Sequence, residues 1–166
     1  MLKTTYKLPA YLSAVGLIYL YYEVLKLFIQ VSMKRKHLES ALSEVDVFDD
    51  PKIELEQIPT SPEIASHMLF IAENSYGDIE DKCVLDLGCG PGILSIAASL
   101  MGAATVCSID VDTDALECAW VNLKKMEVEN VDLVQADVQT LQLQLEKKYD
   151  TMICNPPFGT RNAGID

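Results

Sequence analysis

A short apolar run followed by a glycine-rich loop most constrains the fold of this chain. Residues 83–87 read CVLDL and residues 88–92 read GCGPG. The run is apolar apart from Asp86, which is typical of a strand buried in a parallel sheet. Helical spacing resumes at Ile93, so the glycines form the turn from strand to helix. Because open α/β sheets bind ligands at the carboxyl ends of their strands, this turn is the first candidate binding loop.

Strand and helix patterns alternate after this loop. Further strands are predicted at residues 105–110, 131–135 and 151–155, with helices at 93–101 and 113–126. Residues 141–148 fit a strand by alternation and a crossover by length. Alternation of this kind predicts an α/β fold with a doubly wound parallel sheet, here incomplete at about four strands. The fourth strand is expected to leave an edge open.

Two helices are predicted before the first strand. Leu38, Ala41 and Leu42 recur at helical spacing within residues 33–44. After a loop at 46–62, Ser61 is a good N-cap and Pro62 a good first residue for a helix that runs to about residue 76. These helices and the sheet form one predicted domain, residues 33–166.

Residues 1–32 differ in composition from the rest of the chain. They carry one acid, Glu23, whereas the whole sequence of 166 residues has 25 acidic and 13 basic side chains, a net charge of −12. Residues 8–31 are mostly apolar, carry no charge except at Glu23 and Lys26, and could span a bilayer at roughly 1.5 Å per residue. The segment fits a signal anchor, a signal peptide without an evident cleavage site, or an upstream extension before a start at Met33.

The composition excludes several classes of protein. Its net negative charge excludes the simplest class of nucleic-acid-binding protein, which is basic along its whole length. The five cysteines are odd in number and lack a C-x-x-C pair, which argues against a disulfide framework or a zinc ribbon. We expect Cys83, Cys107 and Cys154 in the core, Cys89 as a small filler of the glycine loop, and no metal site.

The glycine loop favours S-adenosylmethionine over a dinucleotide. Gly88, Gly90 and Gly92 are spaced G-x-G-x-G rather than G-x-G-x-x-G. Asp86, just before them, would repel a pyrophosphate but attract a positively charged amino group. Asp110 ends the second predicted strand, where a carboxylate can accept hydrogen bonds from both hydroxyls of a ribose.

Asp137 follows the third predicted strand. Its carboxylate could accept the exocyclic amine of an adenine, and Val138 could offer its backbone N–H to a ring nitrogen. Alone this signal does not exceed that of a surface turn, but its position at the same end of the sheet strengthens it.

Residues 155–158, Asn155, Pro156, Pro157 and Phe158, are the most specific motif. The amine of an aromatic ring is a poor nucleophile because its lone pair is delocalised. The Asn155 side-chain oxygen and the Pro156 carbonyl can each accept a hydrogen bond from such an amine, turning its lone pair toward a methyl donor. The prolines stiffen the turn, and Phe158 can stack on an extruded base, worth roughly 1–3 kcal/mol.

Taken together, these motifs resemble the signature of class I S-adenosylmethionine-dependent amino-methyltransferases. The resemblance covers residues 34–164 and is closer still to the methyltransferase-like protein 5 family, which methylates N6 of an adenine in small-subunit ribosomal RNA. The residues that carry it are Leu55, Glu56, Gln57, Pro59, Thr60, Ala65, His67, Met68, Leu69, Asp78, Ile79, Glu80, Asp110, Asp112, Asp114, Ala115, Leu116, Glu117 and residues 155–160.

The resemblance implies a fold, a site and partners. The fold is a Rossmann-like class I methyltransferase, and the implied cofactor ligands are Gln57, Thr60, Gly88, Gly90, Pro91, Ile93, Asp110, Asp137 and Val138. The family works as a heterodimer with a small zinc-binding activator of the TRM112 type, which would extend the sheet at the third strand. The implied location is the cytoplasm and nucleus, with membrane association if residues 8–31 act as an anchor.

Two departures from the family leave alternatives open. Residues 1–32 have no counterpart in it, and the family continues for three more strands after the NPPF turn. We therefore expect this chain alone to fold poorly and methylate little. A shortened form that binds only cofactor or partner remains an alternative. So does a protein-glutamine N5 methyltransferase, because NPPF-like motifs serve DNA adenine, RNA adenine and protein glutamine alike.

Overall fold

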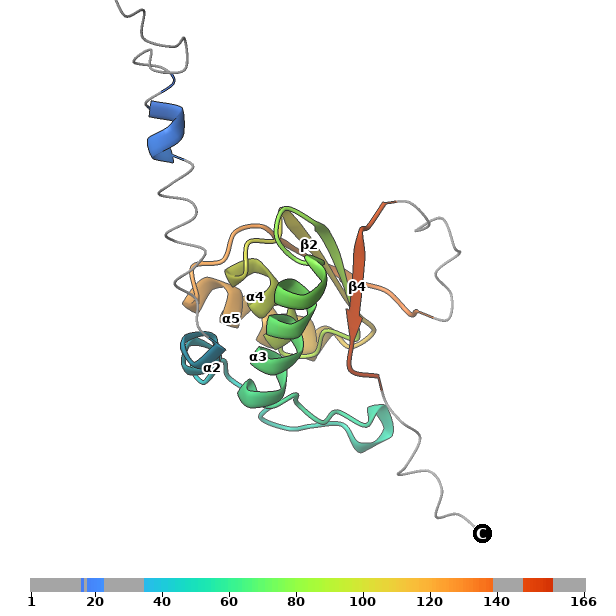
Figure 1. The fold of residues 1–166 in the computed structure, drawn as a ribbon. Helices are drawn as coiled ribbons and strands as arrows, with labels where there is room; N and C mark the ends of the chain where they lie inside the picture. Colours follow the sequence, from blue (N-terminus) through green and yellow to red (C-terminus); the bar gives the residue numbers. More distant parts are fainter. Residues whose placement is uncertain (1–15, 17, 23–34, 139–147, 157–166) are drawn as a thin grey trace, which may run out of the picture. The chain divides into compact units, whose positions relative to one another are not determined.

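The computed structural model describes residue 16 and residues 18–22, 35–138 and 148–156 (Figure 1). Contacts divide the chain into two units, residues 1–34 and 35–166. In the first unit, residues 18–22 are helical. Among the described residues, no helix has both the length and the apolarity needed to cross a membrane. Most of the apolar segment 8–31 lies outside them.

The second unit is built on a four-stranded parallel sheet. Its strands are β1 (Cys83–Leu87), β2 (Thr105–Asp110), β3 (Val131–Gln135) and β4 (Thr151–Cys154), in the order β3-β2-β1-β4. The four predicted strands are confirmed, the last one ending a residue early. Of the described strands, β3 and β4 form the two edges, as predicted.

The register gives the sheet two faces. Leu85 pairs with Cys107 on β2 and Met152 on β4, whereas Asp86 pairs with Ser108 and Ile153. Helix α4 (Ile93–Leu100) covers the Asp86 face, because the Ser95 hydroxyl donates to the Asp86 carboxylate. The core of this unit therefore lies between that face and α4.

Helix α4 carries only apolar residues and serines, which is typical of a helix enclosed on most sides. Residues 93–98 are all buried, and Ile96 and Ala97 are fully so. The helix contacts the sheet on one side and helices α2 (Arg35–Leu42) and α3 (Pro62–Ile71) on the other. Figure 1 shows α3 lying in front of the sheet, next to α4.

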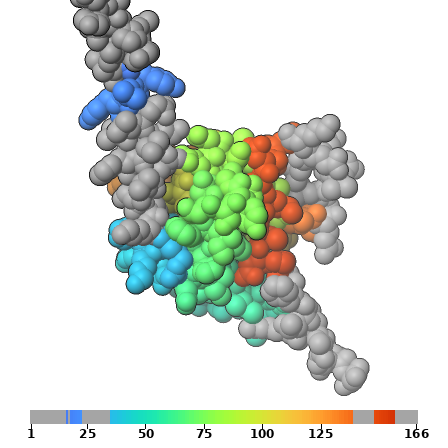
Figure 2. Space-filling view, viewed as in Figure 1, coloured from blue at the N-terminus to red at the C-terminus, as the bar shows by residue number. Residues whose placement is uncertain are grey.

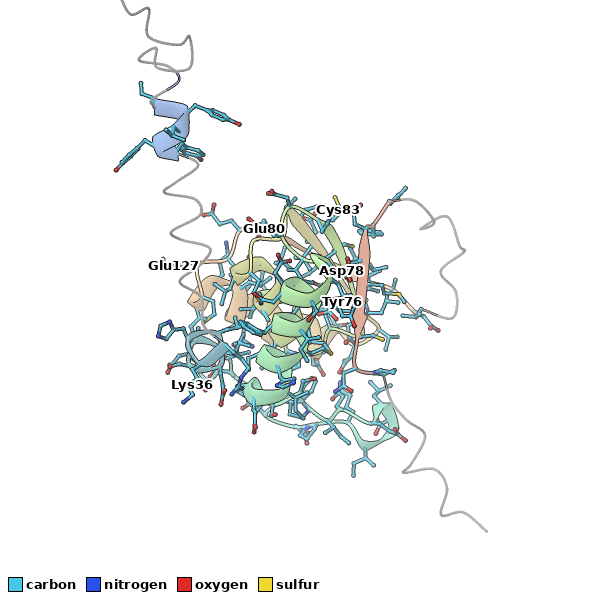
Figure 3. The ribbon with its side chains drawn as sticks, in the orientation of Figure 1. Lys36, Tyr76, Asp78, Glu80, Cys83 and Glu127 are labelled. Carbon is cyan, nitrogen blue, oxygen red and sulfur yellow. The ribbon has the colours of Figure 1, made fainter. Side chains whose placement is uncertain are left out.

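Helix α3 begins as its sequence predicts. The Ser61 hydroxyl accepts a hydrogen bond from the backbone N–H of Ile64, and Pro62 is the first helical residue. A π-helical turn (Ala72–Tyr76) continues the helix to Gly77, whose φ of 67° suits glycine. Figure 3 shows Tyr76 and Asp78 at this end, and the Thr151 hydroxyl donates to the Asp78 carbonyl.

Helix α5 (Thr113–Lys125) follows β2 and is capped by Asp112, whose carboxylate accepts from the N–H of Asp114. Its Asn122 is fully buried and donates to the carbonyls of Asp46 and Pro91. A buried amide side chain therefore joins α5 to the loop that follows α2 and to the glycine loop.

The predicted burial of three cysteines is wrong. Cys83 and Cys107 are half-buried and Cys154 is exposed. Cys107 and Cys154 belong to the face opposite α4, because they pair with Leu85 and Leu87 of β1 and not with Asp86. Figure 2 shows the β4 atoms (red) at the surface beside the green atoms of the chain near residue 78. The ambiguous segment 141–148 lies mostly outside the described residues.

Candidate functional site

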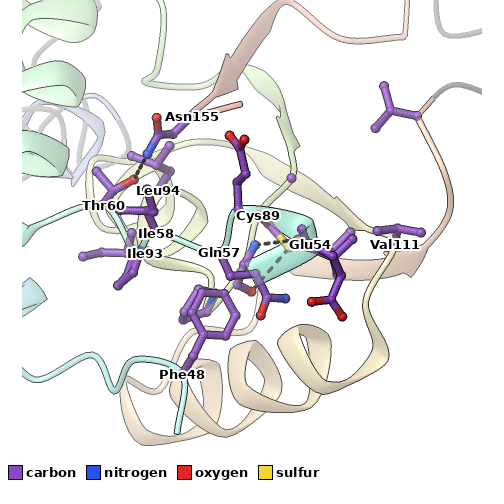
Figure 4. A pocket seen from close by; sticks show the side chains of 18 of the residues that line it. Phe48, Glu54, Gln57, Ile58, Thr60, Cys89, Ile93, Leu94, Val111 and Asn155 are labelled. Carbon is purple, nitrogen blue, oxygen red and sulfur yellow. Dashed lines mark hydrogen bonds between the residues drawn. The ribbon is translucent and has the colours of Figure 1, made fainter. Parts of the chain in front are cut away.

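A cavity of about 470 Å³ opens at the carboxyl ends of the strands (Figure 4). It is bounded by the glycine loop, by the residues that follow β2, β3 and β4, and by the segment before α3. The lining residues are Phe48, Glu54, Leu55, Glu56, Gln57, Ile58, Pro59, Thr60, Gly88, Cys89, Gly90, Pro91, Ile93, Leu94, Asp110, Val111, Ala136, Asp137, Val138 and Asn155. All the predicted cofactor ligands except Asp86 are among them.

The glycine loop is fixed to the end of β2 by backbone hydrogen bonds. The N–H groups of Gly88 and Cys89 both donate to the carbonyl of Ile109, at 2.8 and 3.0 Å. Gly90 has a φ of 53°, and a Cβ placed on it would lie 3.2 Å from Cζ of Phe48. Glycine is needed here both for its conformation and because the Phe48 ring packs against the loop.

Asp110 organises the floor of the cavity. Its two carboxylate oxygens accept from the backbone N–H groups of Gly90 and Asp112, at 2.8 and 2.9 Å. Each carboxylate oxygen has a second lone pair, so the group can still accept hydroxyl protons of a ligand. Its own carbonyl accepts from Ala136 N–H, which brings Asp137 and Val138 to the same cavity.

The segment Lys52 to Thr60, here called the strap, lines part of the cavity and is bonded to other elements at Lys52 and at Thr60. At one end, the Gln57 amide receives a hydrogen bond from Lys52 N–H at 2.8 Å and donates to the Asp112 carboxylate at 2.6 Å. The Lys52 ammonium also pairs with Asp112 and Asp114. Gln57 thus lines the cavity, as predicted, while both ends of its amide are bonded to protein.

Asp86 differs from its predicted position. It is fully buried and does not line the cavity. One carboxylate oxygen accepts from Ser95, whose hydroxyl also lies 2.6 Å from that of Ser108, and the other oxygen has no hydrogen-bond partner. Burial raises the pKa of Asp86 to about 7, although the Ser95 bond opposes the shift. Alternate residues of a strand point to the same face of the sheet. Asp86 therefore shares with Val84 the face that meets helix α4.

Asn155 stands where β4 ends, with its side chain at the cavity. Its amide nitrogen Nδ2 donates to the Thr60 hydroxyl at 2.9 Å, a bond drawn in Figure 4. Pro156 is exposed and is not among the lining residues. Pro157 and Phe158 lie outside the described residues, so their predicted contacts with a base stay predictions.

The side chains around the cavity are acidic or uncharged. Glu54, Glu56, Asp110 and Asp137 line it, and the described lining contains no Lys, Arg or His. Such a cavity favours a ligand with positive charge. Burial, reinforced by Asp86 and Asp110, raises the pKa of the Cys89 thiol, which makes it a filler of the loop rather than a nucleophile. The part of the chain that the structure describes contains no cluster of metal-binding side chains.

Several lining residues were not predicted from the sequence. Phe48, Glu54, Ile58, Leu94 and Val111 border the cavity without any motif of their own. Ile58 and Val111 are exposed hydrophobic side chains that follow predicted ligands in the sequence. That position alone is only a weak indication of a binding site. Phe48 carries no such signal, because it is brought to Gly90 by a contact across 42 positions of the chain.

Known proteins resemble this chain in sequence. The family model described as ribosomal protein L11 methyltransferase (PrmA) matches residues 68–156. The Danio rerio protein named rRNA N(6)-adenosine-methyltransferase METTL5 is 50% identical over 135 residues, which are 81% of this chain and 65% of that protein. The Drosophila melanogaster protein of the same name is 48% identical over 136 residues, 81% of this chain and 64% of that protein.

A solved structure shares the fold. PH1948 of Pyrococcus horikoshii, provisionally assigned as an RNA methyltransferase, is 38% identical with a TM-score of 0.69. The match covers 78% of this chain and 60% of that one. The chain thus spans less than two thirds of the length of these relatives. Its sheet order, its cavity and the matched residues agree with the expectation drawn from the motifs, and the chain belongs to the PrmA family of class I S-adenosylmethionine-dependent methyltransferases.

Proposed function

We propose that this protein transfers a methyl group from S-adenosylmethionine to N6 of an adenine in small-subunit ribosomal RNA. The observation that carries the proposal is Asn155, which lies at the end of β4 on an acidic cavity and has its amide nitrogen engaged by Thr60. Its carbonyl oxygen is thereby left to accept a hydrogen bond from a substrate amine.

The cavity fits the cofactor in size and in charge. Its volume of about 470 Å³ lies in the range of small-molecule sites, roughly 300–1,000 Å³. Asp110 would hold the ribose hydroxyls, Asp137 and Val138 the adenine, and the backbone of Gly88 and Gly90 the methionine portion. When bound, S-adenosylmethionine supplies an electrophilic methyl group on a positively charged sulfur, which the acidic lining favours.

The residues at the end of β4 supply the groups that the substrate needs. The Asn155 oxygen and the Pro156 carbonyl would accept the two hydrogens of the adenine amine and so orient its lone pair. Proline fixes the backbone direction of that carbonyl. Asp86 has no role in this step, because it is buried below the cavity and does not line it. Its predicted contact with the amino group of the cofactor is not supported by this geometry.

The names of the relatives support an RNA substrate. Both METTL5 proteins are named as ribosomal RNA adenosine methyltransferases. The PrmA model is named for a ribosomal protein. Because NPPF-like motifs also serve protein glutamine, a glutamine amide is the second candidate substrate. The same Asn155 oxygen could accept a hydrogen bond from either amine, so the substrate has to be decided by competition between RNA and protein.

A basic partner would complement the charge of this chain. Ribosomal RNA is a polyanion, whereas the chain carries a net charge of −12. We propose that a zinc-binding TRM112-type activator pairs with β3, an edge strand of the described sheet whose Asp132, Val134 and Gln135 are exposed. Edge strands present unpaired backbone groups and are suited to such an addition. We also propose a cytoplasmic and nuclear location for the complex.

The test is methyl transfer by the complete protein together with the activator. Radiolabelled S-adenosylmethionine is incubated with the protein in the presence of small-subunit ribosomal RNA, DNA and an extract of glutamine-containing proteins, and the label in each is measured. We expect label in RNA adenine, and N155A should abolish transfer while leaving the cofactor Kd within a few-fold. Label in protein alone would favour the glutamine substrate. Cofactor binding by calorimetry without transfer to any substrate would indicate a binding protein and overturn the proposal.

A further inference from the structure

We propose that Thr60 is a positioning residue for Asn155: its hydroxyl accepts the amide N–H of Asn155 and turns the Asn155 oxygen toward the substrate amine. This role rests on the proposed function and refines it. It differs from the role that family resemblance gives Thr60, which is that of a cofactor ligand. The two roles predict different kinetic effects.

The geometry supports a direct contact between the two side chains. Asn155 Nδ2 lies 2.9 Å from Thr60 Oγ1, although the residues are 95 positions apart. Among the described residues, the Asn155 side chain makes this one hydrogen bond, and the residue is exposed. The amide is therefore fixed at one of its two ends, and that end is its nitrogen.

The chemistry of an amino substrate requires this orientation. An amine bonded to an aromatic ring presents two N–H donors, so only the oxygen of an asparagine amide can meet it. In the opposite orientation two donors would face each other. Once a base excludes water from the site, the Asn155 nitrogen needs an acceptor, since an unmet donor is costly. The Thr60 hydroxyl oxygen supplies that acceptor.

Thr60 is itself held in place by a rigid element. It directly precedes Ser61, the N-cap of α3, whose hydroxyl accepts from Ile64 N–H. Helix α3 is anchored in the core by Ala65 and Leu69, both fully buried. A positioning group works only if its own location is fixed, and the start of a packed helix provides such a location.

The test compares two variants in the complete protein with its activator. Thr60→Val keeps the shape of the side chain and removes the hydroxyl, whereas Thr60→Ser keeps the hydroxyl and removes a methyl group. We expect T60V to lower kcat about ten- to hundredfold at saturating cofactor, the size expected for an unmet donor in the reacting complex. We expect its cofactor Kd to stay within threefold, and T60S to keep kcat within threefold.

Other results would overturn the inference in distinguishable ways. A higher cofactor Kd for T60V, with kcat unchanged at saturating cofactor, would make Thr60 a cofactor ligand only. A loss of kcat in T60S, with kcat unchanged in T60V, would assign the effect to the methyl group instead of the hydroxyl. A wild-type protein that transfers no methyl group to adenine would overturn the proposed function itself. Thermal melting of each variant identifies any loss that is due to unfolding.

Discussion

The buried carboxyl of Asp86 should make the free energy of unfolding depend on pH, an effect that is independent of catalysis. The side chain is fully buried between β1 and α4, and only one of its oxygens has a partner. Its pKa is raised from 3.8 to about 7, because burial penalises the charged form. Between these two pH values the folded protein holds a proton there that the unfolded chain has lost.

The direction and size of the effect follow from linkage. Where the folded state binds more protons than the unfolded state, stability falls as the pH rises. The loss begins near the unfolded pKa of 3.8, accumulates up to a pH of about 7 and is complete above it. At about 1.4 kcal/mol per pH unit, this one group destabilises the protein by about 4 kcal/mol at pH 8 relative to pH 4.

The variant D86N removes the ionisation and keeps the shape of the side chain. We expect it to equal the wild type in unfolding free energy below about pH 4, where Asp86 is protonated in both the folded and the unfolded state. At pH 8 it should be more stable by an amount on the order of 4 kcal/mol. The measurement is urea unfolding of the protein without cofactor, at intervals from pH 4 to pH 8.

A matched variant controls for the change in net charge. Asp132→Asn neutralises an exposed carboxyl in the same sheet and should change the pH dependence of stability little. If D86N and the wild type keep a constant difference from pH 5 to pH 8, Asp86 does not titrate in that range and the reasoning fails. A D86N protein less stable than the wild type at pH 8 would show that the carboxylate is stabilised by a group this structure does not place there.

Three further predictions concern the cavity and the core. Gly90→Ala places a Cβ on a residue whose φ is 53°, at 3.2 Å from the Phe48 ring. The cofactor affinity measured by calorimetry should therefore fall about tenfold. An unchanged Kd would show that the loop can relax. Asp112→Ala removes the N-cap of α5 and the acceptor of the Gln57 amide. It should lower the free energy of urea unfolding by about 1 kcal/mol and speed hydrogen exchange in the strap. Exchange at the wild-type rate would mean that other contacts hold the strap. Ile96→Ala empties a fully buried position and should cost about 2–5 kcal/mol, and a loss below 1 kcal/mol would contradict the position of α4 at the centre of the core.

The sequence predicts the strands well because each has a local signature. The strands at residues 83–87, 105–110 and 131–135 are short apolar runs between turn residues, and the structure gives them those bounds. Helix α3 is also predicted at its start, since Ser61 and Pro62 form a local capping pattern. Features written into five or six consecutive residues can be inferred without knowledge of the rest of the fold.

Burial is harder to predict, because it depends on what covers each face. Cys107 and Cys154 sit in apolar strands and were expected in the core, yet they are half-buried and exposed. Asp86 was expected at the cavity because it borders the glycine loop, but the alternation of the strand turns it under α4 instead. A sequence pattern gives the period of a strand but not which of its two faces meets the helix.

Contacts between distant residues are beyond the reach of sequence patterns, and two of them define the site. The strap is bonded to the N-cap of α5 through Gln57 and to the end of β4 through Thr60. One bond borders the expected cofactor position and the other reaches Asn155, so a single segment contacts both places. A change that loosens the strap at Asp112 should therefore affect Asn155 as well as cofactor binding.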